Sequence, residues 1–187
     1  MPVTKGDCQF LLASMSTYTI ESYNPEWVKK FEGIKAMLEG VFGSQALAIE
    51  HVGSTSVPGM KAKPIIDVLV VVKDISLLDT EKSVMKSKGY LVEENYVAPN
   101  SLLFRRIDEA GNKLEHIHVC ESGAPMEKQF LAMREYLRMF PEEAQSYALL
   151  KDELVKKYPN DYESYRADKD PFLKSLEARA YKWFELI

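Results

Sequence analysis

Two apolar runs joined by a small polar loop constrain the fold of this chain most strongly. Residues 46–52 and residues 64–72 both have the composition of β-strands. The second run is almost wholly apolar, which is typical of a central strand that is covered on both faces of a sheet. Its single charged residue is Asp67. Because an isolated carboxylate is costly to bury, Asp67 is expected to have a partner, a metal ion or a ligand.

The loop between the two runs has the composition of a phosphate-binding turn. Gly53 can adopt backbone angles that are closed to other residues, and it lets a ligand approach the main chain. The three hydroxyl residues that follow it suit phosphate oxygens, and later cations would compensate charge. The predicted phosphate contacts are Gly53, Ser54, Thr55, Ser56, Lys63 and Arg105. A plain turn between two strands has a similar composition, so the loop alone supports both interpretations about equally.

The rest of the chain predicts an α+β fold in a single domain over residues 1–187. Asn24 and Pro25 begin a helix whose apolar positions recur every three or four residues. The chain after Pro125 has helical patterning throughout. We therefore expect a mixed β-sheet with flanking helices and a helical C-terminal third. The other expected elements are strands at 17–21, 90–94, 102–108 and 113–121 and a helix at 74–88.

Charge and hydropathy exclude several classes of protein. The net charge is −4 and no dense run of Lys and Arg occurs, so a surface for duplex nucleic acid is not expected. No apolar run reaches the length of a membrane span and no signal peptide is recognisable, so we expect a cytoplasmic protein without a membrane partner. Cys8 and Cys120 lie far apart and show no zinc-binding spacing.

The three histidines of the chain all lie on elements beside the loop. His116 and His118 alternate onto one face of the strand at 113–121. If the strands at 46–52 and 113–121 flank the strand at 64–72, His51 and Asp67 converge with them at one end of the sheet. Two histidines and a carboxylate suit Zn, Mn or Fe. The alternative is that each histidine is an ordinary, hydrogen-bonded strand residue.

Other catalytic arrangements have weaker support. Ser54 or Ser56 as a nucleophile would need a general base, and only His51 is close in sequence. Arg134 and Arg138, four residues apart on a predicted helix, are typical of a solvated helix edge. Further cations that could contact a phosphate are Arg105, Arg106, Arg134 and Lys151.

The run IEHVGSTSVPGMKAKPIIDVLV, residues 49–70, resembles the signature of the GrpB family, a branch of the nucleotidyltransferase superfamily. The resemblance starts near residue 23 and continues in HIHV at 116–119, in the segment at 134–141 and in the segment at 147–151. It implies a nucleotidyltransferase-like α+β fold with a mixed sheet.

The resemblance also implies a reaction and its residues. In the wider superfamily a Gly-Ser loop holds a nucleotide triphosphate, and an Asp-x-Asp strand binds two magnesium ions for nucleotidyl transfer. Gly53 and Ser54 match the loop and Asp67 matches the first, catalytic acid, but Leu69 stands where the second acid is expected. The loss of a carboxylate weakens a site for two divalent ions, and imidazoles favour Mn or Zn over Mg. The expected cofactor is therefore a divalent ion, Mn, Zn or Mg.

Three functions stay open at this point. The first is a metal-dependent nucleotidyltransferase that acts on a nucleotide or another phosphorylated small molecule. The second is a non-catalytic ligand-binding or regulatory module that lost its chemistry at Leu69. The third is a protein-interaction domain that docks partners on residues 125–187. GrpB-like domains also occur fused to dephospho-CoA kinase, which links the family to coenzyme A metabolism by association only.

Overall fold

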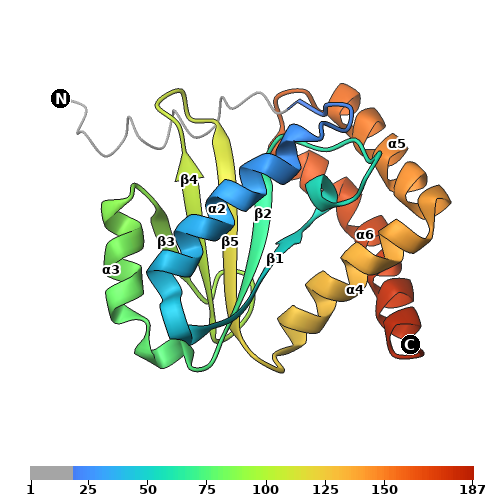
Figure 1. Cartoon of the computed structure of the whole chain (residues 1–187). Coiled ribbons are helices and arrows are strands. Elements are labelled where there is room, and N and C mark those ends of the chain that lie inside the picture. The colour runs from blue at the N-terminus through green and yellow to red at the C-terminus, as the bar shows by residue number, and fades with distance from the viewer. Residues whose placement is uncertain (1–18) are drawn as a thin grey trace, which may run out of the picture.

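The computed structural model describes residues 19–187 and has a five-stranded mixed sheet at its centre (Figure 1). The strand order is β1-β2-β5-β4-β3, with β2 and β5 parallel and the other neighbours antiparallel. The strand at 64–72 is thus flanked by the two strands expected beside it. The strands are β1 (Ala46–Val52), β2 (Ile66–Val72), β3 (Leu91–Glu94), β4 (Ser101–Ile107) and β5 (Lys113–Glu121).

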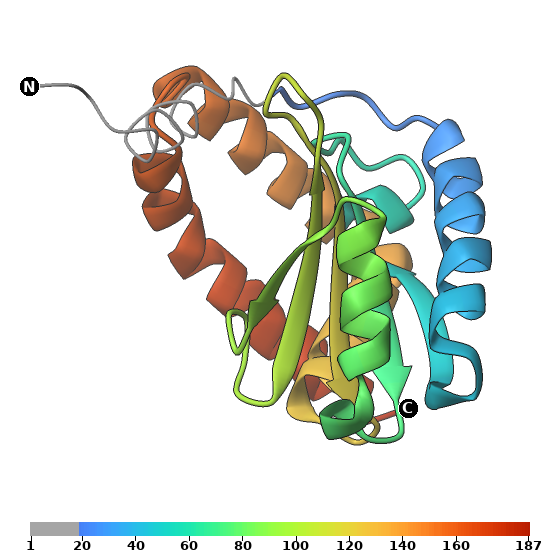
Figure 2. The same cartoon turned by 90° about the vertical axis from the view of Figure 1, so that its left-hand side faces the viewer.

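Helices cover both faces of this sheet. Two of them, α2 (Glu26–Phe42) and α3 (Asp79–Ser87), pack on one face. The opposite face carries the C-terminal helices, α4 (Pro125–Met139), α5 (Pro141–Lys157) and α6 (Tyr162–Phe184). Figure 2 shows the sheet between these two layers. The predicted α+β class, with a helical C-terminal third, is confirmed, and among the described residues no helix combines the length and apolar character needed to cross a bilayer.

The larger core lies between α2, α3 and the sheet. The apolar stripe of α2 is buried there at Trp27, Phe31, Ile34 and Leu38. The side chain of Asn24 supplies a hydrogen-bond acceptor at the start of the helix, because its Oδ1 accepts a hydrogen bond from the backbone N–H of Glu26 at 3.0 Å. The helix therefore begins one residue later than the predicted Pro25. These residues fix α2 on the face of the sheet opposite Asp67.

The loop between β1 and β2 shortens the second predicted strand. The chain turns before it, with the backbone N–H of Ile65 donating to the carbonyl of Lys63 at 2.8 Å, so β2 begins at Ile66 rather than at 64. Ala62 exchanges two backbone hydrogen bonds with Glu21, of 2.8 and 3.0 Å. This bridge is what the structure shows of the predicted strand at 17–21. Residues 17 and 18, like Cys8, lie outside the described residues.

The predicted helix at 74–88 divides into two pieces. A 3₁₀ turn, η3 (Ile75–Leu77), precedes α3. Asp74 causes the break, since its carboxylate accepts hydrogen bonds from the backbone N–H and the hydroxyl of Ser76, at 2.9 and 2.6 Å. Side chains of this type compete with helical hydrogen bonding near a helix start. The two other 3₁₀ turns are η1 (Gly43–Gln45) and η2 (Ser54–Ser56).

The C-terminal helices form a second core of their own. Aromatic and aliphatic side chains of α4, α5 and α6 are buried or half-buried between these helices. Tyr147 stacks on Phe172, with ring centroids 5.8 Å apart, and Trp183 packs edge-on against Tyr136 at 5.8 Å. Leu176 is fully buried among them. This layer holds the lysines and tyrosines of α5 and α6 over the sheet face that carries Asp67.

Candidate metal and phosphate site

Three of the predicted metal ligands meet on the sheet face below the C-terminal helices. In the parallel pairing of β2 and β5, Asp67 lies beside His116, and Leu69 lies beside His118. Oδ1 of Asp67 is 3.1 Å from Nδ1 of His116 and 3.7 Å from Nε2 of His118. One potential ligand atom from each residue lies within 4.8 Å of the other two. Strand alternation and pairing therefore bring the carboxylate and both imidazoles together.

The spacing of these atoms fits a metal ion. A tetrahedral ion with bonds of about 2.0–2.1 Å holds its ligand atoms about 3.3–3.4 Å apart. The separations of 3.1 and 3.7 Å around Asp67 lie on either side of that value. In addition, Nε2 of His116 and Nδ1 of His118 are buried without a hydrogen-bond partner within residues 19–187. They are not the nitrogens that approach Oδ1 of Asp67, and each calls for a hydrogen-bond partner such as a water.

The negative charge of this cluster is on the Asp67 carboxylate, which lies between the two imidazole rings. Burial raises the pKa of Asp67, but hydrogen bonds from His116 and His118 outweigh it, and the pKa lies below its ordinary value. Asp67 is therefore ionised at neutral pH. An anionic oxygen and two imidazole nitrogens form a ligand set that suits Zn or Mn.

Gly53 brings the loop against Asp67. Its φ of +70° and ψ of −173° lie in a region that is almost restricted to glycine. A Cβ atom at this position would lie 2.6 Å from Oδ2 of Asp67. Only a residue without a side chain lets the backbone pass this close to the carboxylate. The next residue, Ser54, is thereby placed at the edge of the candidate metal site, which we call the metal cluster and define as Asp67, His116 and His118.

Two of the predicted phosphate contacts are used inside the loop. The hydroxyl of Ser56 donates to the carbonyl of Gly53 at 2.6 Å, and Ser56 is 4% exposed. The hydroxyl of Thr55 donates to the carbonyl of Ile65 at 3.4 Å and lies 3.0 Å from Nε2 of His51. The predicted phosphate contact Ser56 therefore has its hydroxyl bonded inside the loop, and the Thr55 hydroxyl is held by protein partners.

His51 is not part of the metal cluster, which corrects the sequence prediction. It pairs with Val68 across the sheet, and therefore its side chain lies on the face opposite Asp67. Its ring stacks on Phe31 with centroids 4.8 Å apart. Burial lowers the pKa of His51 to about 4, so the imidazole is neutral and structural.

A cavity of about 260 Å³ opens beside the cluster and is lined by cations and aromatic rings. Lys151 of α5 reaches into it, with Nζ 3.0 Å from the hydroxyl of Ser54 and 2.8 Å from the carbonyl of Lys61. Nζ of Lys63 lies 4.2 Å from the ring centroid of Tyr165. The lining residues that matter most here are Gly53, Ser54, Lys63, Asp67, His116, Tyr147, Lys151, Tyr162, Tyr165 and Lys169.

The lysines around this cavity repel one another. Burial, reinforced by Lys169, lowers the pKa of Lys151 to about 7. Burial, with Lys169 and Lys113 adding to it, likewise lowers the pKa of Lys63 to about 7. Lysines that are brought together at such a cost favour an anion between them. The position of Lys63 agrees with its predicted phosphate role.

The predicted phosphate role of Arg105 does not agree with the structure. Its guanidinium donates to Glu93 at 2.5 Å and lies 5.8 Å from the ring centroid of Tyr96. Arg105 is not among the residues that line the cavity. Its partner Glu93 lies on the neighbouring strand β3, so this ion pair connects the edge strand β3 to β4.

Arg134 and Arg138 support the loop from α4, whereas a solvated edge was predicted. Arg134 donates to the carboxylate of Glu50 at 2.7 Å and to the carbonyl of His51 at 3.0 Å. Arg138 donates to the carbonyl of Ser56 at 2.8 Å. The two guanidiniums therefore hold both ends of the loop that contains Gly53.

Comparison with known proteins agrees with the signature in this loop. The family model described as "GrpB protein" matches residues 17–179. The chain belongs to the GrpB family. The crystal structure of the conserved protein GrpB from Enterococcus faecalis superposes with a TM-score of 0.83 at 32% identity, over 89% of this chain and 99% of that one.

Other relatives extend beyond the matched region. The UPF0157 protein YqkA of Bacillus subtilis is 39% identical over 86% of this chain, which corresponds to 46% of that protein. The chain therefore spans about half the length of this relative. A dephospho-CoA kinase of Mycolicibacterium paratuberculosis is 25% identical over 86% of this chain and 45% of its own length.

Within this GrpB fold, α6 supplies cavity residues that sequence reasoning did not single out. Tyr162, Tyr165 and Lys169 follow one another at spacings of three and four, which places them on one helix face. Two tyrosines and a lysine on one face, without the aliphatic residues of a core stripe, were the available signal. Lys113 joins them, with Nζ 4.8 Å from the centroid of the Tyr162 ring.

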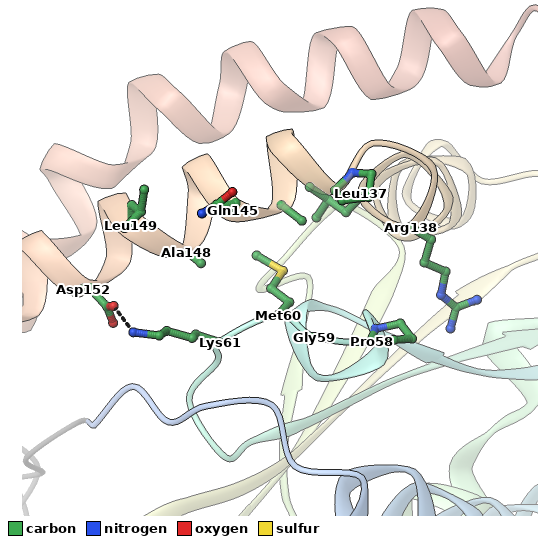
Figure 3. A pocket seen from close by; sticks show the side chains of 12 residues that line it. Pro58, Gly59, Met60, Lys61, Leu137, Arg138, Gln145, Ala148, Leu149 and Asp152 are labelled. Atoms are coloured by element: carbon green, nitrogen blue, oxygen red, sulfur yellow. Dashed lines mark hydrogen bonds and ion pairs between the residues drawn. The ribbon is translucent and has the colours of Figure 1, made fainter.

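A larger cavity, of about 750 Å³, lies away from the metal cluster (Figure 3). It runs between α5 and the loop at 58–61, with Met60 near its middle and Arg138 at one end. Lys61 reaches across to Asp152 at 2.6 Å at the other end. None of the metal-cluster residues lines it. The candidate chemistry therefore belongs to the smaller cavity.

Proposed function

We propose that this GrpB-family chain binds one divalent metal ion and a small phosphorylated ligand, a nucleotide, in the cavity beside it. The observation that carries the proposal is the meeting of Asp67, His116 and His118, with one potential ligand atom of each within 4.8 Å of the others. Zn and Mn are the ions expected to bind more tightly than Mg.

The phosphorylated ligand is inferred from the cations next to the cluster. The ammonium groups of Lys63, Lys151 and Lys169 border the same cavity as Asp67. Burial lowers the pKa of all three lysines, and the charge of neighbouring cations lowers it further, so a bound phosphate would stabilise their protonated forms. Gly53 provides the close backbone approach that such a ligand needs.

We propose nucleotidyl transfer as the reaction, in keeping with the resemblance to the nucleotidyltransferase superfamily. A bound divalent ion would act there as a Lewis acid on a phosphate oxygen. The lysines would hold the phosphate chain and offset its charge. Leu69 is fully buried, which argues for one ion and against the two-ion arrangement.

A non-catalytic ligand-binding module is the second candidate, and one observation favours it. The position of the second acid is occupied by Leu69, which packs with Val52 and Met126 in a small apolar cluster. Such a module would bind the ion and the nucleotide without turnover. The similarity to a dephospho-CoA kinase keeps coenzyme A metabolism as a proposed context, and a role of residues 125–187 in docking proteins stays a prediction.

The test is calorimetric titration of the metal-free chain with Zn, Mn and Mg, followed by titration with ATP, GTP, CTP and UTP in the presence of the preferred ion. We expect one ion per chain, and nucleotide affinity that depends on it. In the same titration, Asp67→Asn should bind the ion more weakly than the wild type. Asp74→Asn is its matched control, because Asp74 lies at a turn on the surface. If the wild-type chain binds no metal, the proposal is overturned. Release of pyrophosphate in the presence of the metal would distinguish the nucleotidyltransferase from the non-catalytic ligand-binding module.

A further inference from the structure

Ser54 and Lys151 form a contact that the proposed metal and phosphate site does not require. Ser54 begins the turn η2 directly after Gly53, and its hydroxyl is 3.0 Å from Nζ of Lys151. Lys151 comes from α5, is 4% exposed, and donates a second hydrogen bond to the carbonyl of Lys61 at 2.8 Å. That second bond fixes the direction of the ammonium group toward the serine.

Of the three hydroxyl groups in the loop, that of Ser54 is accessible to a bound ligand. It borders both the cationic cavity beside Asp67 and a second cavity of about 290 Å³ between the loop, α4 and α6. The two neighbouring hydroxyls are occupied, with Ser56 donating to Gly53 and Thr55 to Ile65. A group bound in either cavity therefore meets the Ser54 oxygen.

Lys151 has the surroundings of a lysine that can act as a base. Burial and the charge of Lys169 lower its pKa to about 7, so a large part of it is a neutral amine at physiological pH. In its protonated form Nζ donates to both the Ser54 hydroxyl oxygen and the carbonyl of Lys61. The neutral amine can keep an N–H for the carbonyl of Lys61 and accept the Ser54 proton on its lone pair. The charged and titratable groups around it are Lys63, Asp67, Tyr147, Asp152 and Lys169.

We propose that Ser54 is a nucleophile and Lys151 its general base, so that the site forms a covalent intermediate on Ser54. The serine oxygen attacks the phosphorus of a phosphoester or phosphoanhydride, and an O–P bond forms as the bond to the leaving oxygen breaks. Lys151 takes the serine proton and passes it to the leaving oxygen. Serine–lysine pairs perform this kind of activation on unrelated folds.

The neighbouring cations make this assignment electrostatically consistent. Lys169, together with the protonated fraction of Lys63, can offset phosphate charge while Lys151 is neutral. His51, the base suggested by sequence proximity, stacks on Phe31, and its Nε2 contacts the hydroxyl of Thr55 at 3.0 Å rather than that of Ser54. The inference rests on the proposed function only for the nature of the transferred group.

The experiment uses a biotinylated fluorophosphonate, which does not depend on the natural substrate. Attack by Ser54 displaces fluoride from phosphorus, and the serine proton goes to Lys151. We expect the full chain to be labelled at Ser54, as located by peptide mass spectrometry, at a rate that rises with pH through about 7. Ser54→Ala is expected to abolish labelling, whereas Ser87→Ala, at an exposed helix end, is expected to leave it unchanged.

Lysine variants separate a base from a structural support. Lys151→Met and Lys151→Arg should each slow labelling by about 100-fold, because neither side chain offers a lone pair at neutral pH. Lys156→Met, exposed on the same helix, is the matched control. If Lys151→Met fails to fold by circular dichroism, the pH profile of the wild-type chain still reports the base.

The outcomes keep this inference apart from the proposed function. An unlabelled Ser54, or labelling that is equally fast in Lys151→Arg and indifferent to pH, would overturn the serine–lysine pair even when metal and nucleotide binding are intact. Labelling that depends on Lys151 would support the pair even when the wild-type chain binds no metal. Metal titration of the same protein sample supplies the second readout.

Discussion

Replacing Gly53 by alanine tests the close approach between the loop and Asp67. The added Cβ would lie 2.6 Å from Oδ2 and 3.0 Å from Cβ of Asp67, distances that no side chain tolerates without movement. The Asp67 side chain is held on its other side by His116, so it cannot withdraw freely. The carboxylate must therefore shift or the loop must open.

The cost has two parts. A φ of +70° with ψ near 180° costs a residue with a Cβ about 1–3 kcal/mol. For a chain of this size each kcal/mol lowers Tm by about 2–4 °C, so we expect Gly53→Ala to melt roughly 2–12 °C below the wild type. Displacement of a ligating carboxylate should in addition weaken metal binding by at least about 10-fold.

The assay is a thermal melt of the metal-free chain together with Zn and Mn titrations. Gly40→Ala is the matched control, because Gly40 lies in α2 with no heavy atom within 4 Å of the added Cβ. Helix propensity alone should stabilise that variant by about 1 kcal/mol. A Gly53→Ala protein with unchanged Tm and unchanged metal affinity would refute the argument that glycine is required beside Asp67.

Three other predictions concern the same site. Asp67→Asn should reduce Zn and Mn affinity by more than about 100-fold in calorimetric titrations, since the anionic oxygen between the two imidazoles is lost, and unchanged affinity would place the ion elsewhere. Pyrophosphate affinity should fall as pH rises through about 7, because Lys63 and Lys151 lose their charge there. The ligand-free chain should respond in the opposite sense: the pKa values of both lysines are lowered on folding, so the unfolded chain binds more protons between about pH 7 and 10, and Tm should rise with pH over that window.

The sheet and the cluster of Asp67, His116 and His118 were largely predictable from the sequence. The face of the sheet on which His51 lies was not. Alternation along a single strand puts His116 and His118 on one face, and the parallel pairing with β2 brings Asp67 to them. Whether His51 joins them depends on the register between β1 and β2. A slip of one residue moves a side chain to the other face, and a loop with no fixed turn type does not set that register.

Lys63 and Lys151 were among the cations predicted to contact a phosphate, but their meeting at one cavity with residues of α6 could not be predicted, for a different reason. Lys151 and Lys169 stand on helices far along the chain from the loop at 53–56. The helical pattern gives the apolar face of each helix, but it does not give the sheet face that the helix covers. The position of Ser54 against Lys151 is therefore a tertiary contact, and proximity in the sequence pointed only to His51, which stacks on Phe31.

The pairing of β2 with β5 also gives a physical account of Leu69. Leu69 lies directly beside His118 on the same sheet face, one row away from the pair of Asp67 and His116. A carboxylate at position 69 would place a second anion next to an imidazole already directed at Asp67. With leucine there, the row offers one nitrogen ligand and an apolar wall that packs against Met126 and Cys120. The acid that resemblance leads one to expect on β2 is thus absent at the point where β5 supplies a histidine. This arrangement favours a single, softer ion over a pair of magnesium ions.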